Sequence, residues 1–512
     1  MGGVVNLITQ PPNASTRFNV RSYLESIGRY NINGSANFSK GKHSVQGSFA
    51  RNFFSGWSAV DSLDRFQTWK PKTQYTADLQ YNFDLNRKVK FNYYGSYLNE
   101  KISNKGQPII NPYEGYAFDE YYRTNRIINS VNGSIKVSDK ESFNFTNSYT
   151  HYHRTKNRFK KDLVTLNQFE TKSQGDQDTT IFKTFHHRGV LSSSRIKNTE
   201  ALLGYEFLHE TGQSFKLAED TITMKDLGIF SSINFSYKKI SVQPSLRMTI
   251  NSLYANGFTP AVHLMYNLSA NSQLRASYAN GYRVPSLKEL YLQFIDQNHT
   301  IIGNSELKPE KGNHYELGLE KSFSIQDSKF CLTLNAMHND IQDMIALAVY
   351  NSQGILRVYD NIERYRNWLA NTQLKLNTTS IQTQVGIGYI LVESSNIMPQ
   401  HTIWEFNTAI SYKIPKIKTS VNFNYKFNSK QPVLTVEENF LFTDPLHIAN
   451  MSLQRKFFNN ALVLQLGVKN LLNIQSSTLN GLSGAQGSAH TGATGMQLFP
   501  ERSLFVDVQY SF

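Results

Sequence analysis

Apolar and polar residues alternate along the last eleven residues of the chain, Arg502 to Phe512. Side chains in a β-strand point alternately to opposite faces of the sheet. This segment therefore predicts a strand with one apolar face and one largely polar face. The apolar set comprises every second residue: Leu504, Val506, Val508, Tyr510 and Phe512.

The same alternation recurs along the chain. Residues 75–83 and 89–97 flank the short polar turn 84–88, and residues 404–412 and 421–427 form a similar pair. Repeated segments of about ten alternating residues, separated by turns, are typical of membrane-crossing strands. Such segments number roughly twenty by eye, which predicts an all-β fold, a transmembrane antiparallel β-barrel of about 22 strands. The residues expected to face lipid include Tyr75, Leu79, Phe91, Phe423 and Tyr510, whereas Gln80 and Asn424 are expected to face the lumen.

The connections between these segments differ in length. Turns of four or five residues alternate with polar stretches of about 20 to 30 residues or more, an asymmetry expected of short periplasmic turns and long extracellular loops. Several soluble β-sandwiches would also alternate, but no Pro/Gly/Ser-rich linker divides the chain. The candidate long connections are residues 102–126, 152–184, 281–313 and 474–502.

Composition supports a barrel with a polar interior. Mean hydropathy is −0.43, although the chain holds 28 Tyr and 33 Phe. A polar lumen and polar loops lower the average, while lipid-facing strands use aromatic residues. The sequence has no run of about 18 apolar residues that would form a transmembrane helix. The single cysteine, Cys331, excludes an internal disulfide framework and a multi-cysteine metal site.

The net charge of +14 raises the question of an anionic partner. The basic residues form neither a helical stripe nor a recognised nucleic-acid motif, so no nucleic-acid partner is expected. Scattered basic residues could instead contact lipid phosphates at the membrane surface or attract anionic ligands to the mouth of the barrel.

Two boxes in the middle of the chain carry a family resemblance. Residues 280–291 read NGYRVPSLKELY, and residues 303–310 read GNSELKPE. They resemble the paired FRAP and NPxL-KPE boxes of TonB-dependent outer-membrane receptors, of the kind found in Bacteroidetes. Pro285 should end the strand 274–280, and the capping-box spacing of Ser286 and Glu289 predicts a short helical turn. The residues that match the family boxes are Tyr282, Arg283, Pro285, Ser286, Glu289, Asn304, Leu307, Pro309 and Glu310.

Segments near the two ends extend the resemblance. Residues 2–9, GGVVNLIT, are similar to the last plug-domain strand of the family, and residues 467–473, GVKNLLN, to the motif before its final strands. The resemblance implies the last strand of a truncated plug at 1–10 and a receptor barrel at 11–512. Nearly all of the family's plug, with its TonB-contacting segment, would precede this chain. The implied partners are outer-membrane lipid, the inner-membrane TonB complex acting through the plug, and the barrel-assembly machinery, which would recognise Phe512.

Ligand-binding candidates come from the loops and strand ends. In haem-uptake members of the family, a histidine between the two boxes is an axial ligand candidate, and His299 occupies that place. His151 and His153 share one strand face and could supply a second ligand. An anionic ferric complex would instead be bound by aromatic and basic residues such as Tyr291, Arg283 and Lys160. Each of these residues could equally be a polar surface or loop-shaping residue.

The resemblance implies a cell outer-membrane receptor and transporter for a scarce metal chelate, with a ferric siderophore ranked first and haem and cobalamin as alternatives. The iron chelate or haem would be cargo, and no resident cofactor or metal is expected. A passive pore and a surface-binding barrel are rivals of another class. We find no nucleophile elbow, phosphate loop or paired catalytic carboxylates, so an enzyme is not expected.

Overall fold

The computed structural model describes residues 16–58, 65–67, 69–173, 175–215, 217, 221–291, 293–295, 300–349, 356–394, 398–433, 441–480, 495–497 and 500–512. Residues 1–10, predicted to be the last plug strand, lie outside these ranges, and so does His299. Both predictions therefore stay predictions.

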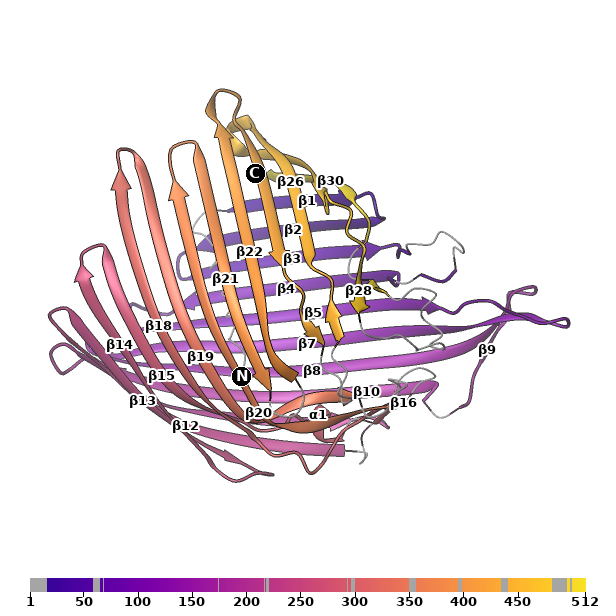
Figure 1. Ribbon diagram of the computed structural model, residues 1–512, viewed down its shortest axis with the longest axis horizontal. Helices are drawn as coiled ribbons and strands as arrows, with labels where there is room; N and C mark the ends of the chain where they lie inside the picture. The colour runs from indigo at the N-terminus through magenta and orange to yellow at the C-terminus, as the bar shows by residue number, and fades with distance from the viewer. Residues whose placement is uncertain are drawn as a thin grey trace.

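The chain forms a closed antiparallel barrel of 22 strands, which confirms the predicted fold class. Each strand pairs with the next along the chain, and the last pairs with the first. Figure 1 shows the first strands beside the last one, so that the two ends of the sheet meet in the wall. The barrel strands are β1 (Arg17–Glu25), β2 (Arg29–Lys40), β3 (His43–Phe54), β4 (Lys72–Asp84), β5 (Val89–Lys105), β7 (Gly115–Ser138), β8 (Glu141–Asp162), β10 (Gln177–Ser193), β11 (Thr199–Gln213), β12 (Thr221–Tyr237), β13 (Ile240–Asn251), β14 (Gly257–Ser269), β15 (Ser272–Arg283), β18 (Glu310–Ile325), β19 (Ser328–Val349), β20 (Leu356–Asn377), β21 (Ile381–Ser394), β22 (Met398–Ile414), β23 (Thr419–Asn428), β26 (Leu446–Phe457), β27 (Leu462–Lys469) and β30 (Ser503–Ser511).

Short elements decorate the connections. None of the helices in the described part of the chain has the length and apolar character needed to span a bilayer. The short elements are β6 (Ile109–Ile110), β9 (Gln168–Glu170), α1 (Leu287–Tyr291), β16 (Gln293–Ile295), β17 (Thr300–Ile302), the 3-10 turns Pro415–Ile417 and Phe458–Asn460, β24 (Pro432–Val433), β25 (Leu441–Thr443), β28 (Ser476–Asn480) and β29 (Gly495–Gln497).

The two faces of the sheet differ in polarity, as the alternation predicts. Leu79 is 45% exposed and Tyr510 44% exposed on the outward face, where an apolar side chain is stable only against lipid. Along each strand, the residues that alternate with the outward apolar ones face inward, and many of them are joined by polar contacts. Asn132, for example, donates to Asn92 Oδ1 at 3.2 Å and accepts from Thr146 Oγ1 at 2.8 Å. Strand register likewise places Tyr75, Phe91 and Phe423 outward, and Gln80 and Asn424 inward.

The two rims differ as predicted, but the predicted lengths of two long connections are wrong. One rim, the short-turn rim, carries turns of two to five residues, and we call the opposite rim the long-loop rim. The polar stretches 102–126 and 152–184, predicted to be loops, are largely strand, because β5, β7, β8 and β10 continue past the membrane. Both faces of such extensions meet water, so the apolar alternation disappears although the hydrogen-bonded ladder continues. The short turns are residues 41–42, 85–88, 139–140, 194–198, 238–239, 270–271, 326–327, 378–380, 415–418 and 458–461.

Polar contacts tie the seam where β1 meets β30. Arg21 Nε donates to Asp507 Oδ1 at 2.9 Å and Arg21 Nη2 to Oδ2 at 2.5 Å, across 486 positions of sequence. Ser503 Oγ donates to Glu25 Oε1 at 2.6 Å. The Phe18 and Phe512 rings stack at 5.4 Å on the outward face. The seam is thus held on both faces.

We expect Asp507→Ala to weaken this seam. The substitution removes a two-pronged charge-assisted hydrogen bond, worth about 1–2 kcal/mol when one partner is half exposed. Unfolding titrations in phospholipid vesicles measure the loss. Asp84→Ala is the matched control, because its contact to Lys90 at 3.8 Å is exposed and should contribute little. Equal stability of the two variants would contradict the prediction.

Candidate ligand-binding site

Arg283 ends β15 as the centre of an ion-pair cluster. Its Nη2 donates to Glu310 Oε1 at 2.6 Å and its Nε to Glu310 Oε2 at 2.8 Å. Its Nη1 donates to Glu289 Oε2 at 3.0 Å. Glu310 is only 3% exposed and also accepts the Ile345 amide at 2.9 Å. Two carboxylates therefore occupy Arg283, and the cluster joins the first box to the second.

The predicted helical turn is present as α1. Glu289 Oε2 accepts the Ser286 amide at 2.7 Å, and Ser286 Oγ accepts the Glu289 amide at 3.3 Å, which is the reciprocal geometry of a capping box. Leu287 packs with Leu217, Ile222 and Met224, and Tyr291 contacts this cluster. Tyr291 thus helps to seat α1 against the barrel wall.

The second box completes this scaffold. The Asn304 amide donates to Glu289 O at 2.9 Å, and Leu307 is 2% exposed. A Cβ on Gly303 would lie 2.6 Å from the Tyr291 amide nitrogen, so only glycine allows this close approach. Pro285 is fully buried, Tyr282 O–H donates to Ala255 O at 2.6 Å, and Pro309 precedes β18. In the structure, the family motif residues shape the loop. Arg283 is engaged by two carboxylates and Tyr291 packs beside α1, so ligand binding by either residue stays a prediction.

The predicted histidines on β8 point away from the lumen. His151 pairs with Ile127 and shares the outward face with Tyr149, which is 42% exposed. His153 lies two positions further along the same face. The structure therefore does not bring His151 and His153 to the mouth of the barrel. Lys160 does face inward, but its Nζ bonds Glu114 at 2.9 Å and covers the Tyr116 ring at 4.2 Å.

Basic and aromatic side chains interleave on the inward face of the tall β7–β8 hairpin, which projects beyond its neighbours in Figure 1. The Arg158 guanidinium lies 4.4 Å from the Phe118 ring centroid and bonds Asp176 at 3.1 Å. Lys156 bonds Glu120 at 3.0 Å. Toward the long-loop rim, each of these cations thus has a carboxylate partner.

The adjoining loop holds Asp176 ionised. Burial alone would raise the pKa of this carboxyl group. Hydrogen bonds from Thr171 and Arg158, together with the Arg158 charge, outweigh burial and hold the pKa below its usual range. The loop that follows β8 is therefore fastened to the hairpin by a full ion pair at neutral pH.

Closer to the membrane, two arginines on this face lack such partners. Arg126 pairs with Tyr152 across β7 and β8, which makes Arg154 its diagonal neighbour on the same inward face. In the described part of the chain, neither guanidinium has a carboxylate within ion-pair distance. The Arg154 guanidinium lies 4.8 Å from the Tyr122 ring centroid, and its buried Nε has no hydrogen-bond partner in the structure. We call Arg126 and Arg154 the arginine pair.

Aromatic side chains surround the arginine pair. Tyr152 and Phe182 pair across β8 and β10 with ring centroids 6.3 Å apart, on the same inward face. Two unpaired guanidinium groups beside aromatic rings suit a bulky anion with flat surfaces. Sequence reasoning named Lys160 and the histidines but missed this pair. The signal was available, because an outward Tyr149 makes even-numbered β8 residues face inward.

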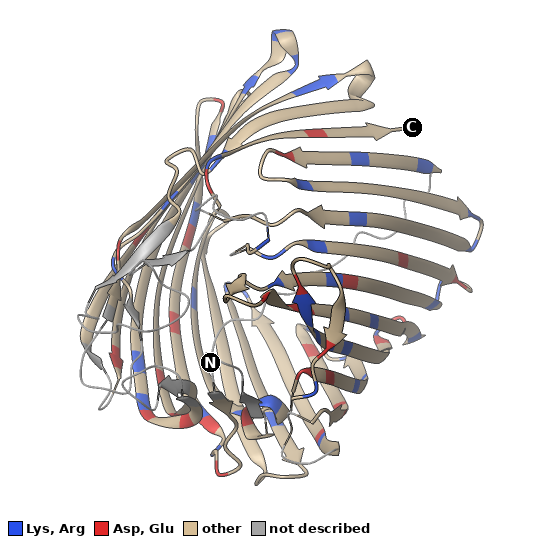
Figure 2. Ribbon diagram, turned by 90° about the vertical axis from the view of Figure 1, so that its right-hand side faces the viewer, with Lys and Arg blue, Asp and Glu red and all other residues tan. Residues whose placement is uncertain are grey.

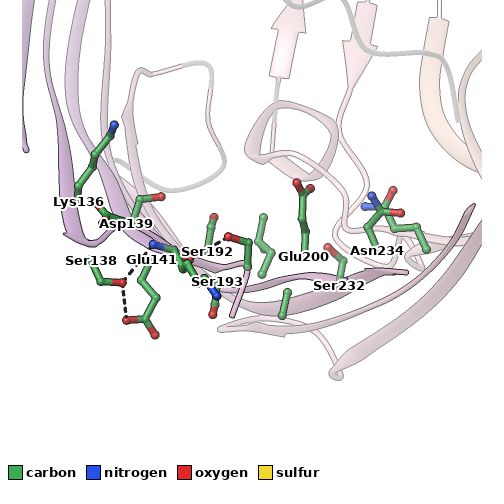
Figure 3. A pocket seen from close by; sticks show the side chains of 15 residues that line it. Lys136, Ser138, Asp139, Glu141, Ser192, Ser193, Glu200, Ser232 and Asn234 are labelled. Atoms are coloured by element: carbon green, nitrogen blue, oxygen red, sulfur yellow. Dashed lines mark hydrogen bonds between the residues drawn. The ribbon is translucent and has the colours of Figure 1, made fainter. Parts of the chain in front are cut away.

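A polar pocket lies at the short-turn rim, on the inward face of β7 to β13. Figure 3 shows Lys136, Glu141, Ser192, Glu200 and Asn234 around it. No aromatic residue lines this pocket, so it does not match the chemistry of the arginine pair. Among the described residues, no group of three or more His, Cys, Asp or Glu side chains could hold a metal ion.

Solved structures with the same fold include siderophore receptors and an iron transporter. The siderophore receptor PirA from Acinetobacter baumannii superposes with a TM-score of 0.77 at 14% identity, covering 100% of this chain and 82% of that chain. The ferric enterobactin receptor PfeA from Pseudomonas aeruginosa, in complex with BCV-L6, gives 0.77 at 16% identity, covering 100% and 83%. The FrpB iron transporter from Neisseria meningitidis gives 0.71 at 11% identity, covering 98% and 82%. These likenesses establish the fold.

Sequence comparison with curated proteins gives shorter matches. The hemoglobin and hemoglobin-haptoglobin-binding protein B of Haemophilus influenzae is 30% identical over 109 residues, which is 20% of this chain. That match spans only 10% of the length of the Haemophilus protein. Across most of the chain, by contrast, residues 10–471 match the family model for the β-barrel of TonB dependent receptor-like proteins. The chain therefore belongs to the TonB-dependent receptor family, as a transmembrane β-barrel of the outer membrane.

Proposed function

We propose that this barrel serves the uptake of a ferric siderophore. The arginine pair carries this proposal, because it offers two unneutralised guanidinium groups beside aromatic rings on the inward face. Ferric chelates built on catecholate or carboxylate groups are bulky anions with flat ligand arms. Arginine binds such oxygen donors in a fork geometry, and the aromatic rings can stack on the arms. The names of the PirA and PfeA receptors support the same substrate class.

Haem uptake is the second candidate, favoured by the short match to the Haemophilus haemoglobin-binding protein. His299 would supply the axial nitrogen, but it lies outside the described residues. His151 and His153 face outward and do not converge on the inward face. The described residues thus favour the siderophore, and no contact among them favours cobalamin, a passive pore or a protein-capturing surface. The TonB complex, acting through a plug whose last strand is residues 1–10, would drive release, and the assembly machinery would recognise Phe512.

The test compares ligands and charge-removal variants of the purified receptor. We expect ferric enterobactin to quench intrinsic fluorescence at low salt, with affinity falling as salt rises. Arg126→Gln combined with Arg154→Gln should weaken binding by about tenfold or more, since each charge-assisted bond is worth about 1.5–3 kcal/mol before screening.

The matched control removes two outward cations, by Lys183→Gln combined with Lys225→Gln, and should leave the affinity unchanged. Haemin and cyanocobalamin, added separately, should bind no more weakly to the arginine variant than to the parent. Unchanged affinity of the arginine variant for ferric enterobactin would refute this site. A haemin Soret shift that His299→Ala abolishes, without ferric enterobactin binding, would refute the siderophore assignment in favour of haem.

A further inference from the structure

A continuous row of basic residues crosses the outward face of six neighbouring strands. Lys101 on β5 pairs with Arg123 on β7. His151 on β8 pairs with Lys183 on β10, and His209 on β11 pairs with Lys225 on β12. Between β7 and β8, and between β10 and β11, the basic residues are diagonal neighbours across the ladder, so the row continues from strand to strand. We call this row the basic ribbon: Lys101, Arg123, His151, His153, Lys183, His209 and Lys225.

The basic ribbon lies where the wall leaves the apolar part of the membrane. On the same outward face, Tyr97, Tyr149 and Phe185 lie on the short-turn side of the ribbon, and they are 41–44% exposed. Aromatic residues of a barrel mark the two membrane interfaces. The ribbon follows them toward the long-loop rim, which places it at the headgroup level of the outer leaflet. Lys101, Arg123, Lys183 and Lys225 are exposed.

The charge of the ribbon is not neutralised within the protein. Over the described ranges, none of its four lysine and arginine side chains has a carboxylate within ion-pair distance, and Asp119, higher on the outward face, is occupied by Arg65 at 2.5 Å. Two outward cations on β20 are paired. On β20, Arg364 bonds Asp340 at 2.5 Å and Arg366 bonds Glu393 at 3.3 Å. Figure 2 shows basic and acidic residues along many strands of the barrel.

We propose that the basic ribbon binds phosphate groups on the lipid headgroups of the outer leaflet. An unpaired cation on a lipid-facing wall is costly unless an anion meets it, and phosphate monoesters at headgroup depth carry that charge. Lysine and arginine extend along the wall to reach them, while their stems cover apolar surface. The imidazole N–H groups of the three histidines add hydrogen-bond donors between the cations. This lipid contact is independent of the chelate site, although β7 and β8 carry both on opposite faces.

The test uses two probes that differ only in phosphate, bisphosphorylated lipid A and its dephosphorylated form, added to the detergent-solubilised receptor and counted by native mass spectrometry. A basic side chain near an anionic membrane surface is worth about 1 kcal/mol, or about fivefold in affinity. The combined variant Lys101→Gln, Arg123→Gln, Lys183→Gln and Lys225→Gln should therefore bind lipid A several hundredfold more weakly, about 600-fold if the four contributions add. Raised salt should reduce parent binding and have less effect on the variant.

The matched control removes four exposed inward cations: Lys136→Gln, Lys375→Gln, Lys413→Gln and Lys426→Gln. It changes the net charge equally and should leave lipid A binding as in the parent. Heat-modifiable migration of both combined variants reports that the barrel has folded. Equal binding of the dephosphorylated lipid, or equal losses in the ribbon and control variants, would overturn the proposal. Retained lipid A affinity in the folded ribbon variant would also overturn it, and binding of an acidic peptide instead would assign the ribbon to a protein partner.

Discussion

Arg283→Met is expected to lower the free energy of opening of the α1 region by about 2–4 kcal/mol. The substitution leaves the carboxylate of Glu310, which is 3% exposed, without its counter-ion. Removing one partner of a buried ion pair leaves the other charge without water or a counter-ion. The estimate sits at the lower end for buried pairs because the Arg283 side chain is 37% exposed, so solvent reaches part of the site. Hydrogen exchange of the α1 amides and of the Ile345 amide, which donates to Glu310, measures the effect.

Two further variants separate charge from packing. Lys311→Met changes the neighbouring exposed cation on β18 and should leave exchange unchanged. Adding Glu289→Gln and Glu310→Gln to Arg283→Met should recover part of the protection, because neutral amides cost less to bury than carboxylates. Full protection in the single variant would mean that the cluster does not hold the two boxes together.

Leu79→Arg is expected to destabilise the barrel by about 2–4 kcal/mol, the cost of an arginine at mid-depth on a lipid-facing strand. Leu79 faces outward between Gly47 and Gly95, so neighbouring side chains offer the guanidinium no partner. Reversible unfolding in phospholipid vesicles, followed by tryptophan fluorescence, gives the free energy.

Gln80→Arg provides the control one residue away. Gln80 faces inward beside Gln46 and Tyr94, where a guanidinium remains hydrated. Its cost should stay below about 1 kcal/mol, as expected for a surface substitution. Equal costs at the two neighbouring positions would contradict the assignment of the faces.

The faces of the barrel strands could be predicted because lipid on one side and water on the other impose a period of two. Leu79, Tyr510 and Phe423 were assigned correctly for this reason. The extensions of β7 and β8 escaped prediction because water contacts both of their faces, so residues such as Lys156 and Arg158 carry no periodic signal. Their strand conformation depends on cross-strand hydrogen bonds and cation–ring contacts, which no single sequence position reveals.

The site was predicted less well than the fold. The sequence motifs pointed to Arg283 and Glu310, but only the structure shows that these two residues form an ion pair with each other. Lys160 was selected for its charge, and its partner Glu114 lies 46 positions away in sequence. Arg126 and Arg154 are selected because they are unpaired on the inward face, and whether a charge is paired depends on all neighbouring strands. It could not be predicted from a local motif.

The seam between β1 and β30 has a consequence for the order of folding. Every other strand pairs with a neighbour across a connection that can close early, whereas the contact of Arg21 with Asp507 spans 486 positions and must close the whole chain. The entropy of that closure makes the seam the last pairing to form. Until then the sheet has two open edges, at β1 and β30, each able to pair with another chain. A partner that shields these edges until Arg21 reaches Asp507 would suppress aggregation without contacting any other strand.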